Sequence, residues 1–193
     1  MKMELEKLSV KWFVEQPNTV PLTDFIDIFH GWIQATDGVY HDVADYSHMH
    51  TGPGIVLVAN DANVSIDESD DRRGLLYSRK SPLSGSNQER LRAVLRSGLE
   101  NFSKLEREPQ LNGKFKLLGN EAVIAIHDRL TSPNTDESFA AVGPEIEAVV
   151  KSLFGGAEIS LEREQDGRRK FAVRIKASCS FSAKELLDRL SKN

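Results

Sequence analysis

The sequence predicts an α+β fold in which a mostly antiparallel sheet has about four helices packed on it. Several short runs are rich in β-branched and aromatic residues and are separated by brief turn sequences, a pattern typical of antiparallel strands. Four other segments repeat apolar residues at helical spacing. The 193-residue chain is 39% hydrophobic and 28% charged, which is the composition of a globular protein rather than a disordered one.

The first part of the chain predicts a strand and then a helix. Residues 8–16, LSVKWFVEQ, are strand-forming and stop at Pro17. Thr23 is placed to cap a helix whose first turn carries two aspartates near the positive end of the helix dipole. Gly38 ends the helical pattern. The bulky face of this helix consists of Phe25, Phe29, Trp32 and Ile33.

The next segment predicts several strands and the longest helix. Side chains in residues 39–46 alternate between two faces as they do in a strand. The apolar run that begins at Gly54, GIVLVAN, predicts a central strand. The segments VSIDES and GLLYSRK predict further antiparallel strands joined by a turn. A loop at residues 84–87 then precedes a helix that must end by Pro109, and Gly98 inside it costs about 1 kcal/mol relative to alanine. Its apolar stripe is Leu91, Val94, Leu95, Leu99, Phe102 and Leu105.

The second half of the chain predicts strands and two more helices. Residues 114–127 predict either two short strands or one strand bent around Gly119. Residues 139–154 are helical in pattern, with Pro144 expected in the first turn. A hairpin follows, with its turn at QDG. Ser182 and Glu185 have the spacing of a capping box for a last helix.

We expect residues 1–193 to form a single compact domain, with 1–112 and 113–193 as an alternative subdivision. The polar stretch EREPQLNG marks that boundary. Both halves run strand, helix, strands, helix, which suggests two similar βαββα-like halves, although no identity between their residues is visible.

Composition also bears on partners and location. A net charge of −4 with both signs interspersed argues against a nucleic-acid partner. The longest apolar run is about six residues, far short of a membrane span. Cys179 is the only cysteine, so no intramolecular disulfide can form, and we expect a cytoplasmic protein.

The stretch Tyr40–Gly54, YHDVADYSHMHTGPG, is the candidate functional site because it concentrates histidines, aspartates and tyrosines. In an extended segment His48 and His50 lie on the same face, about 6.6 Å apart, close enough to bind one divalent metal ion. A third ligand would come from Asp42, His41 or His127. The alternative is that these histidines only hydrogen-bond to loop carbonyls.

The same stretch has two other interpretations. A histidine paired with Asp42 or Asp45 would suit acid–base chemistry near neutral pH. Anion binding at TGPG is disfavoured, because the loop precedes a strand rather than a helix and Pro53 lacks an N–H group. The candidate ligand-binding residues are therefore Tyr40, His41, Asp42, Asp45, Tyr46, His48, His50 and His127.

The sequence leaves two functional hypotheses open, and whether the protein is an enzyme is undecided. The first is a small binding or protein-interaction domain, which we expect to form a homo-oligomer through its hairpins. The second is a metal- or histidine-dependent enzyme that acts on a small molecule at Tyr40–Gly54.

Overall fold

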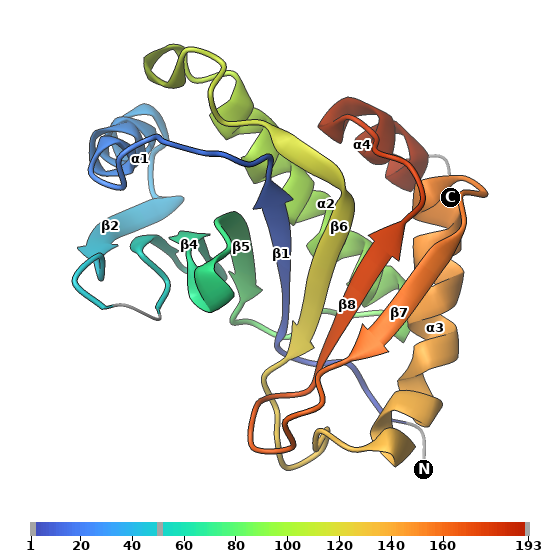
Figure 1. Ribbon diagram of the computed structural model, residues 1–193. Coiled ribbons are helices and arrows are strands. Elements are labelled where there is room, and N and C mark those ends of the chain that lie inside the picture. The colour runs from blue at the N-terminus through green and yellow to red at the C-terminus, as the bar shows by residue number, and fades with distance from the viewer. Residues whose placement is uncertain (1–2, 50–51, 192–193) are drawn as a thin grey trace.

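The computed structural model describes residues 3–49 and 52–191, which form one continuous antiparallel sheet with helices packed on it (Figure 1). Among these residues there are eight strands, in the order β2-β3-β4-β5-β1-β6-β8-β7, and four α-helices. The predicted α+β class is confirmed. The strands are β1 (Leu8–Val14), β2 (Tyr40–Asp45), β3 (Ile55–Ala59), β4 (Ala62–Asp67), β5 (Gly74–Arg79), β6 (Leu117–Ile126), β7 (Ile159–Arg163) and β8 (Ala172–Ala177). The helices are α1 (Asp24–Ala35), α2 (Asn87–Glu106), α3 (Asp136–Phe154) and α4 (Ala183–Ser191), with 3₁₀ turns at Ser69–Asp71 and Pro109–Leu111.

The helices gather on one face of the sheet. Helix α2 packs against β1 and β5, α3 against β7, and α1 against β2 and β3, while α4 packs on α2 and α3. Figure 1 shows α2 and α3 behind the strands. No helix among the described residues is long and apolar enough to cross a membrane.

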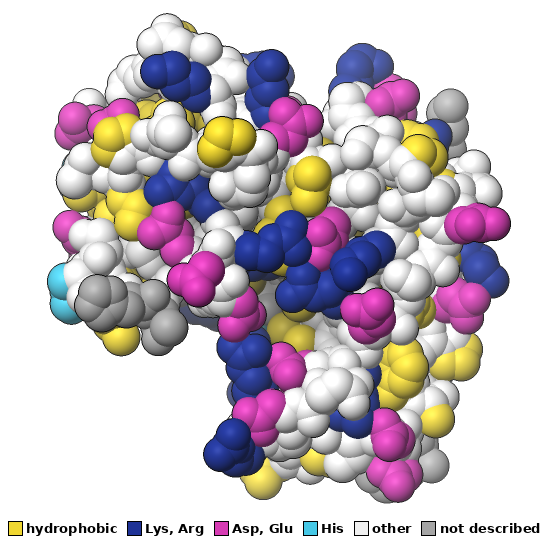
Figure 2. Space-filling model, in the orientation of Figure 1, with side chains coloured by type: hydrophobic (Ala, Val, Ile, Leu, Met, Phe, Trp, Pro, Cys, Tyr) yellow, Lys and Arg dark blue, Asp and Glu magenta, His cyan; other side chains and the backbone are white. Residues whose placement is uncertain are grey.

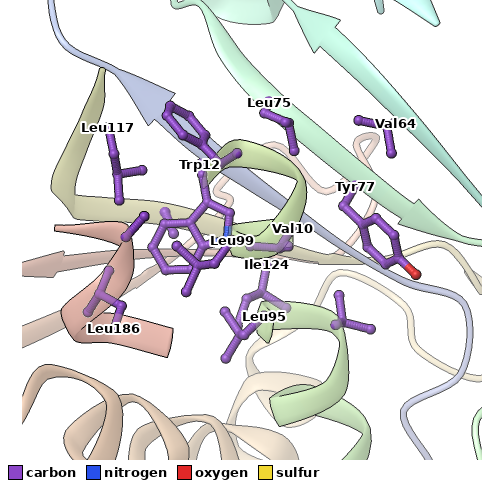
Figure 3. Close-up of a cluster of buried hydrophobic side chains, with 14 of the residues drawn as sticks. Val10, Trp12, Val64, Leu75, Tyr77, Leu95, Leu99, Leu117, Ile124 and Leu186 are labelled. Atoms are coloured by element: carbon purple, nitrogen blue, oxygen red, sulfur yellow. The ribbon is translucent and has the colours of Figure 1, made fainter. Parts of the chain in front are cut away.

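Strand β1 is buried on both faces, and the two faces differ in chemistry. Val10 and Trp12 point toward the helices and join the core, together with Leu95 and Leu99 of α2 (Figure 3). Ser9, Lys11 and Phe13 alternate with them, as the period of a strand requires, and are only 1%, 8% and 2% exposed. We call the sheet face that carries these three residues the open face. Because β1 lies in the interior of the sheet, the segments that bury these three residues cover the middle of the open face.

The expected apolar stripe of α2 is buried along its whole length, from Leu91 to Leu105. Burying a large aliphatic or aromatic side chain contributes about 1.5–3 kcal/mol, so this helix is held chiefly by its packing. Gly98 lies at the closest approach of α2 to β1. A Cβ at Gly98 would lie 2.7 Å from Cγ1 of Val10 and 3.0 Å from the Trp12 ring. Glycine at this position therefore sets the distance between helix and sheet.

Two helices begin with reciprocal caps. The Glu185 carboxylate accepts a hydrogen bond from the Ser182 N–H at 2.8 Å, and the Ser182 hydroxyl accepts one from the Glu185 N–H at 3.3 Å. This confirms the capping box expected there. Ser86 and Glu89 make the same arrangement at the start of α2. Each box satisfies two backbone N–H groups that the first helical turn would otherwise leave without partners.

The structure corrects two local expectations and decides between the two alternatives left open for residues 114–127. Helix α3 begins at Asp136, where Thr135 accepts a hydrogen bond from the Ser138 N–H, so Pro144 lies inside the helix rather than in its first turn. Residues 117–126 form one continuous strand, bent at Gly119 with φ of +77°. A β-bulge between Tyr40 and Asp42 shifts the alternation of β2, so the ring of Tyr40 packs onto the helix-covered core.

The two halves of the chain share a pairing scheme. In the first half, β1 pairs with β5, the strand that precedes α2. In the second half, β6 pairs with β8, the strand that precedes α4. Because β1 also pairs with β6, the halves join side by side at the centre of the sheet. The β4–β5 turn (residues 68–73) and the β7–β8 turn (residues 164–171) occupy corresponding positions in this scheme.

Candidate functional site

Tyr40, the first residue of the predicted site, is engaged in packing between α1 and β2. Its ring centroid lies 6.3 Å from that of Trp32. The ammonium group of Lys104 lies 3.8 Å from the Trp32 ring centroid and 5.5 Å from that of Tyr40. Removal from water raises the pKa of the Tyr40 hydroxyl, and Tyr77 raises it further. The contacts of Tyr40 are thus those of a residue that fixes the edge of the sheet to a helix.

The other candidate site residues of the stretch that the structure describes are exposed and make local contacts. Asp42 accepts a hydrogen bond from the Val43 N–H, and Asp45 accepts one from the Ser47 N–H, both at 2.8 Å. The bonds from Ser47 lower the pKa of Asp45, and the charge of His48 adds to this effect. No hydrogen bond or ion pair joins Asp45 and His48 among the described residues, so their interaction acts only through water. His41, Tyr46 and His48 are exposed.

The metal hypothesis for this stretch stays a prediction. His50, the second histidine of the predicted pair, lies outside the described residues. The described residues, 3–49 and 52–191, contain no group of three or more histidine, cysteine, aspartate or glutamate side chains that could hold a metal ion.

His127 lies in a different part of the molecule. It follows β6, and four strands separate β6 from β2 in the sheet. At about 4.8 Å per strand, the two regions are roughly 24 Å apart. Nε2 of His127 forms a 2.8 Å hydrogen bond with the hydroxyl of buried Ser9 on the open face. The structure thus places His127 beside β1 and not with the Tyr40–Gly54 stretch.

The environment of His127 predicts a dependence of stability on pH. His127 is exposed as a whole, but the side of its ring that bonds to Ser9 has lost water; this loss, with the charge of Lys170, lowers the pKa from 6.5 to about 4. Between these values the unfolded chain binds a proton that the folded chain does not, so the free energy of unfolding falls as pH falls from about 6.5 to 4. We expect His127→Asn to weaken this dependence in urea unfolding curves. His41→Asn, at an exposed position, is the control, and an unchanged slope in His127→Asn would contradict the prediction.

The open face contains a cleft of about 370 Å³ next to Ser9. The cleft is open above the sheet because the side chains paired across the strands there are small. Ser9 on β1 pairs with Ala125 on β6, and Ala125 pairs with Ala172 on β8. Leu76 and Val123 extend the floor with apolar surface. In Figure 2, which views this face, charged side chains gather around a hollow at the centre of the molecule.

The β4–β5 and β7–β8 turns approach each other over this cleft. The guanidinium of Arg169 bonds to Asp70 of the opposite turn at 2.7 Å and to Glu164 of its own turn at 2.8 Å. Asp70 and Asp71 both have left-handed backbones, with φ of 59° and 55°. Such conformations cost about 1 kcal/mol or more in a residue other than glycine and often mark functional sites. We call the two turns, joined by Arg169 and Asp70, the roof.

One wall of the cleft is a cluster of arginines around Glu121. Arg72 makes a two-pronged contact with the Glu121 carboxylate at 2.7 and 2.9 Å, and Arg174 adds a third bond at 2.6 Å. The Arg72 guanidinium also lies 4.0 Å from the ring centroid of Phe13. Cation–π contact and charge-assisted bonds together fix these side chains in position.

A buried ion pair joins β1 to β4 beside this wall. Nζ of Lys11 lies 2.5 Å from Oδ1 of Asp67 and also donates to the Ser69 carbonyl at 3.0 Å. The two residues are 8% and 4% exposed. Burial lowers the pKa of Lys11, and Asp67 opposes that effect. Asp67 in turn accepts hydrogen bonds from the N–H and hydroxyl of Ser69, so the pair anchors the β4–β5 turn over the sheet.

The cleft carries an excess of positive charge although the whole chain is negative. Among the described residues, six cationic side chains and four carboxylates line it, and Glu121, bonded to Arg72 and Arg174 in the wall, is a fifth carboxylate; the net charge of the whole chain is −4. Lys170 is an exposed residue and forms no ion pair with any residue that the structure describes. Partial removal from water lowers its pKa; Arg169 and Lys11 lower it further, and Asp67 acts in the opposite direction. Its ammonium group is therefore a charge without a fixed counter-ion.

The residues of this cleft were not identified from the sequence as a site. Residues 70–73, DDRR, and residues 168–170, RRK, have the composition of solvated turns, and their approach to each other depends on strand order. One signal was present: a lysine in the middle of the strand LSVKWFV, where lysine is rarely buried without a partner.

Comparison with known proteins does not assign a family to this chain. A scan against models of protein families finds no match, and a search of curated proteins finds none either.

Proposed function

We propose that the protein is a small binding domain whose ligand is an anionic small molecule held in the cleft on the open face. The observation that carries this proposal is the convergence of cationic side chains from β1, β8 and both roof turns on one hollow, with Lys170 lacking a fixed counter-ion. Charged groups fixed by their own partners before a ligand arrives need little reorganisation on binding.

The dimensions and lining of the cleft support this proposal. A volume of about 370 Å³ lies at the lower end of the roughly 300–1,000 Å³ typical of small-molecule sites. Leu76, Val123 and Ala125 offer apolar surface to the body of a ligand, while cations surround it. Apolar contact with a few fixed polar groups is the usual composition of a ligand pocket.

Filling the cleft is expected to abolish binding. The side chain of Ala172 points into the floor, so Ala172→Phe would occupy the ligand volume. Ser160→Phe is the matched control, because Ser160 is an exposed open-face position on edge strand β7 outside the cleft lining. The assay is a two-dimensional amide NMR titration with small carboxylates, small phosphates and neutral molecules of similar shape.

We expect anionic compounds to shift the signals of cleft residues in the parent and in Ser160→Phe, but not in Ala172→Phe. Shifts caused equally by the neutral compounds, or no shifts at the cleft with any compound, would reject the proposal. Circular dichroism of each variant establishes that the fold is retained.

A second candidate is the metal- or histidine-dependent enzyme at Tyr40–Gly54. Asp45 and His48 lie three positions apart in the same exposed segment, where a carboxylate could orient the histidine ring for proton transfer once a ligand is bound. Metal analysis of untagged protein tests the metal form of this hypothesis.

Three further expectations remain proposals. A cytoplasmic location is supported by Cys179, which is free and exposed. A homo-oligomer is supported by Val39, Tyr46 and Met49, which are exposed apolar side chains near edge strand β2. Gel filtration with light scattering measures the oligomeric state. The acidic net charge supports the absence of a nucleic-acid partner.

A further inference from the structure

Arg174, in the wall of the cleft, keeps one edge of its guanidinium group free. Its Nη1 atom donates to Glu121 at 2.6 Å, whereas its Nε and Nη2 atoms have no hydrogen-bond partner among the residues that the structure describes. The side chain lines the cleft and is 30% exposed. The N–H groups on Nε and Nη2 of a guanidinium lie in one plane and point the same way. The free edge of Arg174 is therefore a pair of parallel donors that an anion in the cleft can reach.

The guanidinium of Arg174 is held in place by the rest of the wall. Glu121, whose side chain is only 10% exposed, accepts hydrogen bonds from both Arg72 and Arg174. The two guanidinium groups also lie over the same Phe13 ring, at 4.0 and 5.6 Å from its centroid. Arg72 has both Nη atoms on Glu121, so Arg174 is the arginine of this wall with a free Nε–Nη2 edge. A fork that is fixed in advance loses little side-chain entropy when an anion binds.

The acidic neighbours of Arg174 leave this edge unpaired. Glu162 faces Arg174 across the β7–β8 ladder. Its carboxylate is exposed, lies 3.8 Å from the ammonium group of Lys176, and forms no ion pair with Arg174 among the described residues. Asp70, whose charge interacts with that of Arg174, bonds to Arg169 instead. A ligand is thus left to supply the acceptor.

Charge and shape both indicate which anion suits this fork. With Glu121 included, six cationic side chains and five carboxylates surround the cleft, so the positive excess is one charge. A carboxylate carries one negative charge and balances that excess, whereas a phosphate monoester carries about 1.5–2 near neutral pH. The two oxygens of a carboxylate are also coplanar and match two parallel N–H donors one to one. A monocarboxylate therefore fits this wall better than a dianion.

We propose that Arg174 binds the carboxylate of the ligand through Nε and Nη2, and that the ligand of the cleft is a small monocarboxylate with an apolar body. This inference rests on the proposed function, because it names the anion and the residue that contacts it. Val123 pairs with Arg174 across the β6–β8 ladder, and Ala125 follows on the same face of β6. An apolar group attached to the carboxylate therefore lies on these two side chains.

Benzoate, phenyl phosphate and benzamide are suitable probes, because they share a ring and differ in the head group. We expect benzoate to bind most tightly by calorimetry and to shift the Nε–H signal of Arg174 in heteronuclear NMR spectra. Arg174→Lys keeps the charge but loses the planar fork, and it should weaken benzoate binding by about tenfold, the loss expected for one charge-assisted hydrogen bond. Arg168→Lys is the matched control, since Arg168 is exposed and lies outside the cleft lining.

Glu162→Gln tests the same site through a gain of affinity, which a damaged fold does not produce. Removing the negative charge opposite Arg174 should tighten benzoate binding by about two- to threefold, the size expected for one exposed charge at cross-strand distance. Glu158→Gln, at an exposed position outside the lining, removes the same charge and should leave the affinity unchanged. Unchanged or weaker binding in Glu162→Gln would place the carboxylate of benzoate away from Arg174.

The outcomes separate this inference from the proposed function. If phenyl phosphate binds in the cleft as tightly as benzoate, or if Arg174→Lys keeps its fold by circular dichroism and binds benzoate as the parent does, the carboxylate site at Arg174 is rejected while anion binding by the cleft stands. If neither anion shifts the signals of cleft residues, or if benzamide binds as tightly as benzoate, both proposals fail. A preference for benzoate that depends on Arg174 and not on Arg168 supports both.

Discussion

Lys11→Met is expected to lower the free energy of unfolding by about 3 kcal/mol, because it leaves the carboxylate of Asp67 buried without its counter-ion. The hydrogen bonds from Ser69 to Asp67 persist in this variant and place the loss at the lower end of the usual range for a broken buried pair. Urea unfolding monitored by tryptophan fluorescence measures it. Lys184→Met, which breaks the exposed pair with Asp188, should change the same free energy by less than about 0.5 kcal/mol.

The double variant Lys11→Met, Asp67→Leu sharpens this test. Both charges are then replaced by apolar groups of similar size, so no buried charge is left unpaired, and we expect a free energy of unfolding within about 1 kcal/mol of the parent. A double variant as unstable as Lys11→Met would show that the pair itself contributes net stability. If the double variant recovers, the ion pair is retained for positioning the β4–β5 turn over the cleft.

Gly98→Ala is expected to destabilise the protein by about 1–3 kcal/mol, although alanine is the better helix former. The added methyl group would lie 2.7 Å from Cγ1 of Val10 and 3.0 Å from the Trp12 ring, both in the centre of the core. Helix and strand would have to move apart, which costs packing along the whole length of α2. Chemical denaturation reports the change.

Gly31→Ala is the natural control for Gly98→Ala. Gly31 also lies within a helix, and a Cβ there would have no atom within 4 Å. Helix propensity then acts alone, and we expect a gain of about 0.5–1 kcal/mol. The opposite signs of the two substitutions distinguish packing from propensity. A stabilised Gly98→Ala would mean that α2 has room to move away from β1.

The fold class was predictable because local patterns specify it. The stripe from Leu91 to Leu105 and the Ser182–Glu185 spacing each identify a helix through short-range chemistry, and both are confirmed. The bulge after Tyr40 was not visible, since it depends on how β2 pairs with β3. The start of α3 was missed because Pro144 was taken as a first-turn residue, whereas the Thr135 cap lies further upstream.

The cleft was harder to predict because its contacts join residues distant in sequence. Lys11 and Asp67 are 56 positions apart, and Glu121 lies 49 positions from Arg72. The two-residue alternation of side chains along a strand indicates which face of the sheet each side chain occupies. It does not indicate which strands are neighbours. Histidine-rich composition drew attention to Tyr40–Gly54, whereas the cationic cluster comes from turns that look like ordinary solvated hairpin ends when taken one at a time.

The roof has a consequence for how fast a ligand enters and leaves. The pair between Arg169 and Asp70 is about half exposed on both sides, at 49% and 52% of side-chain area, so water and salt screen it. An exposed pair of this kind contributes at most about 1 kcal/mol, and side chains held so weakly rearrange on the nanosecond timescale. For an anionic ligand bound as proposed, the roof would therefore hardly slow exchange, and contacts with the floor of the cleft would set its residence time. Under the proposed function, the protein would follow the concentration of its ligand closely instead of holding the ligand for long.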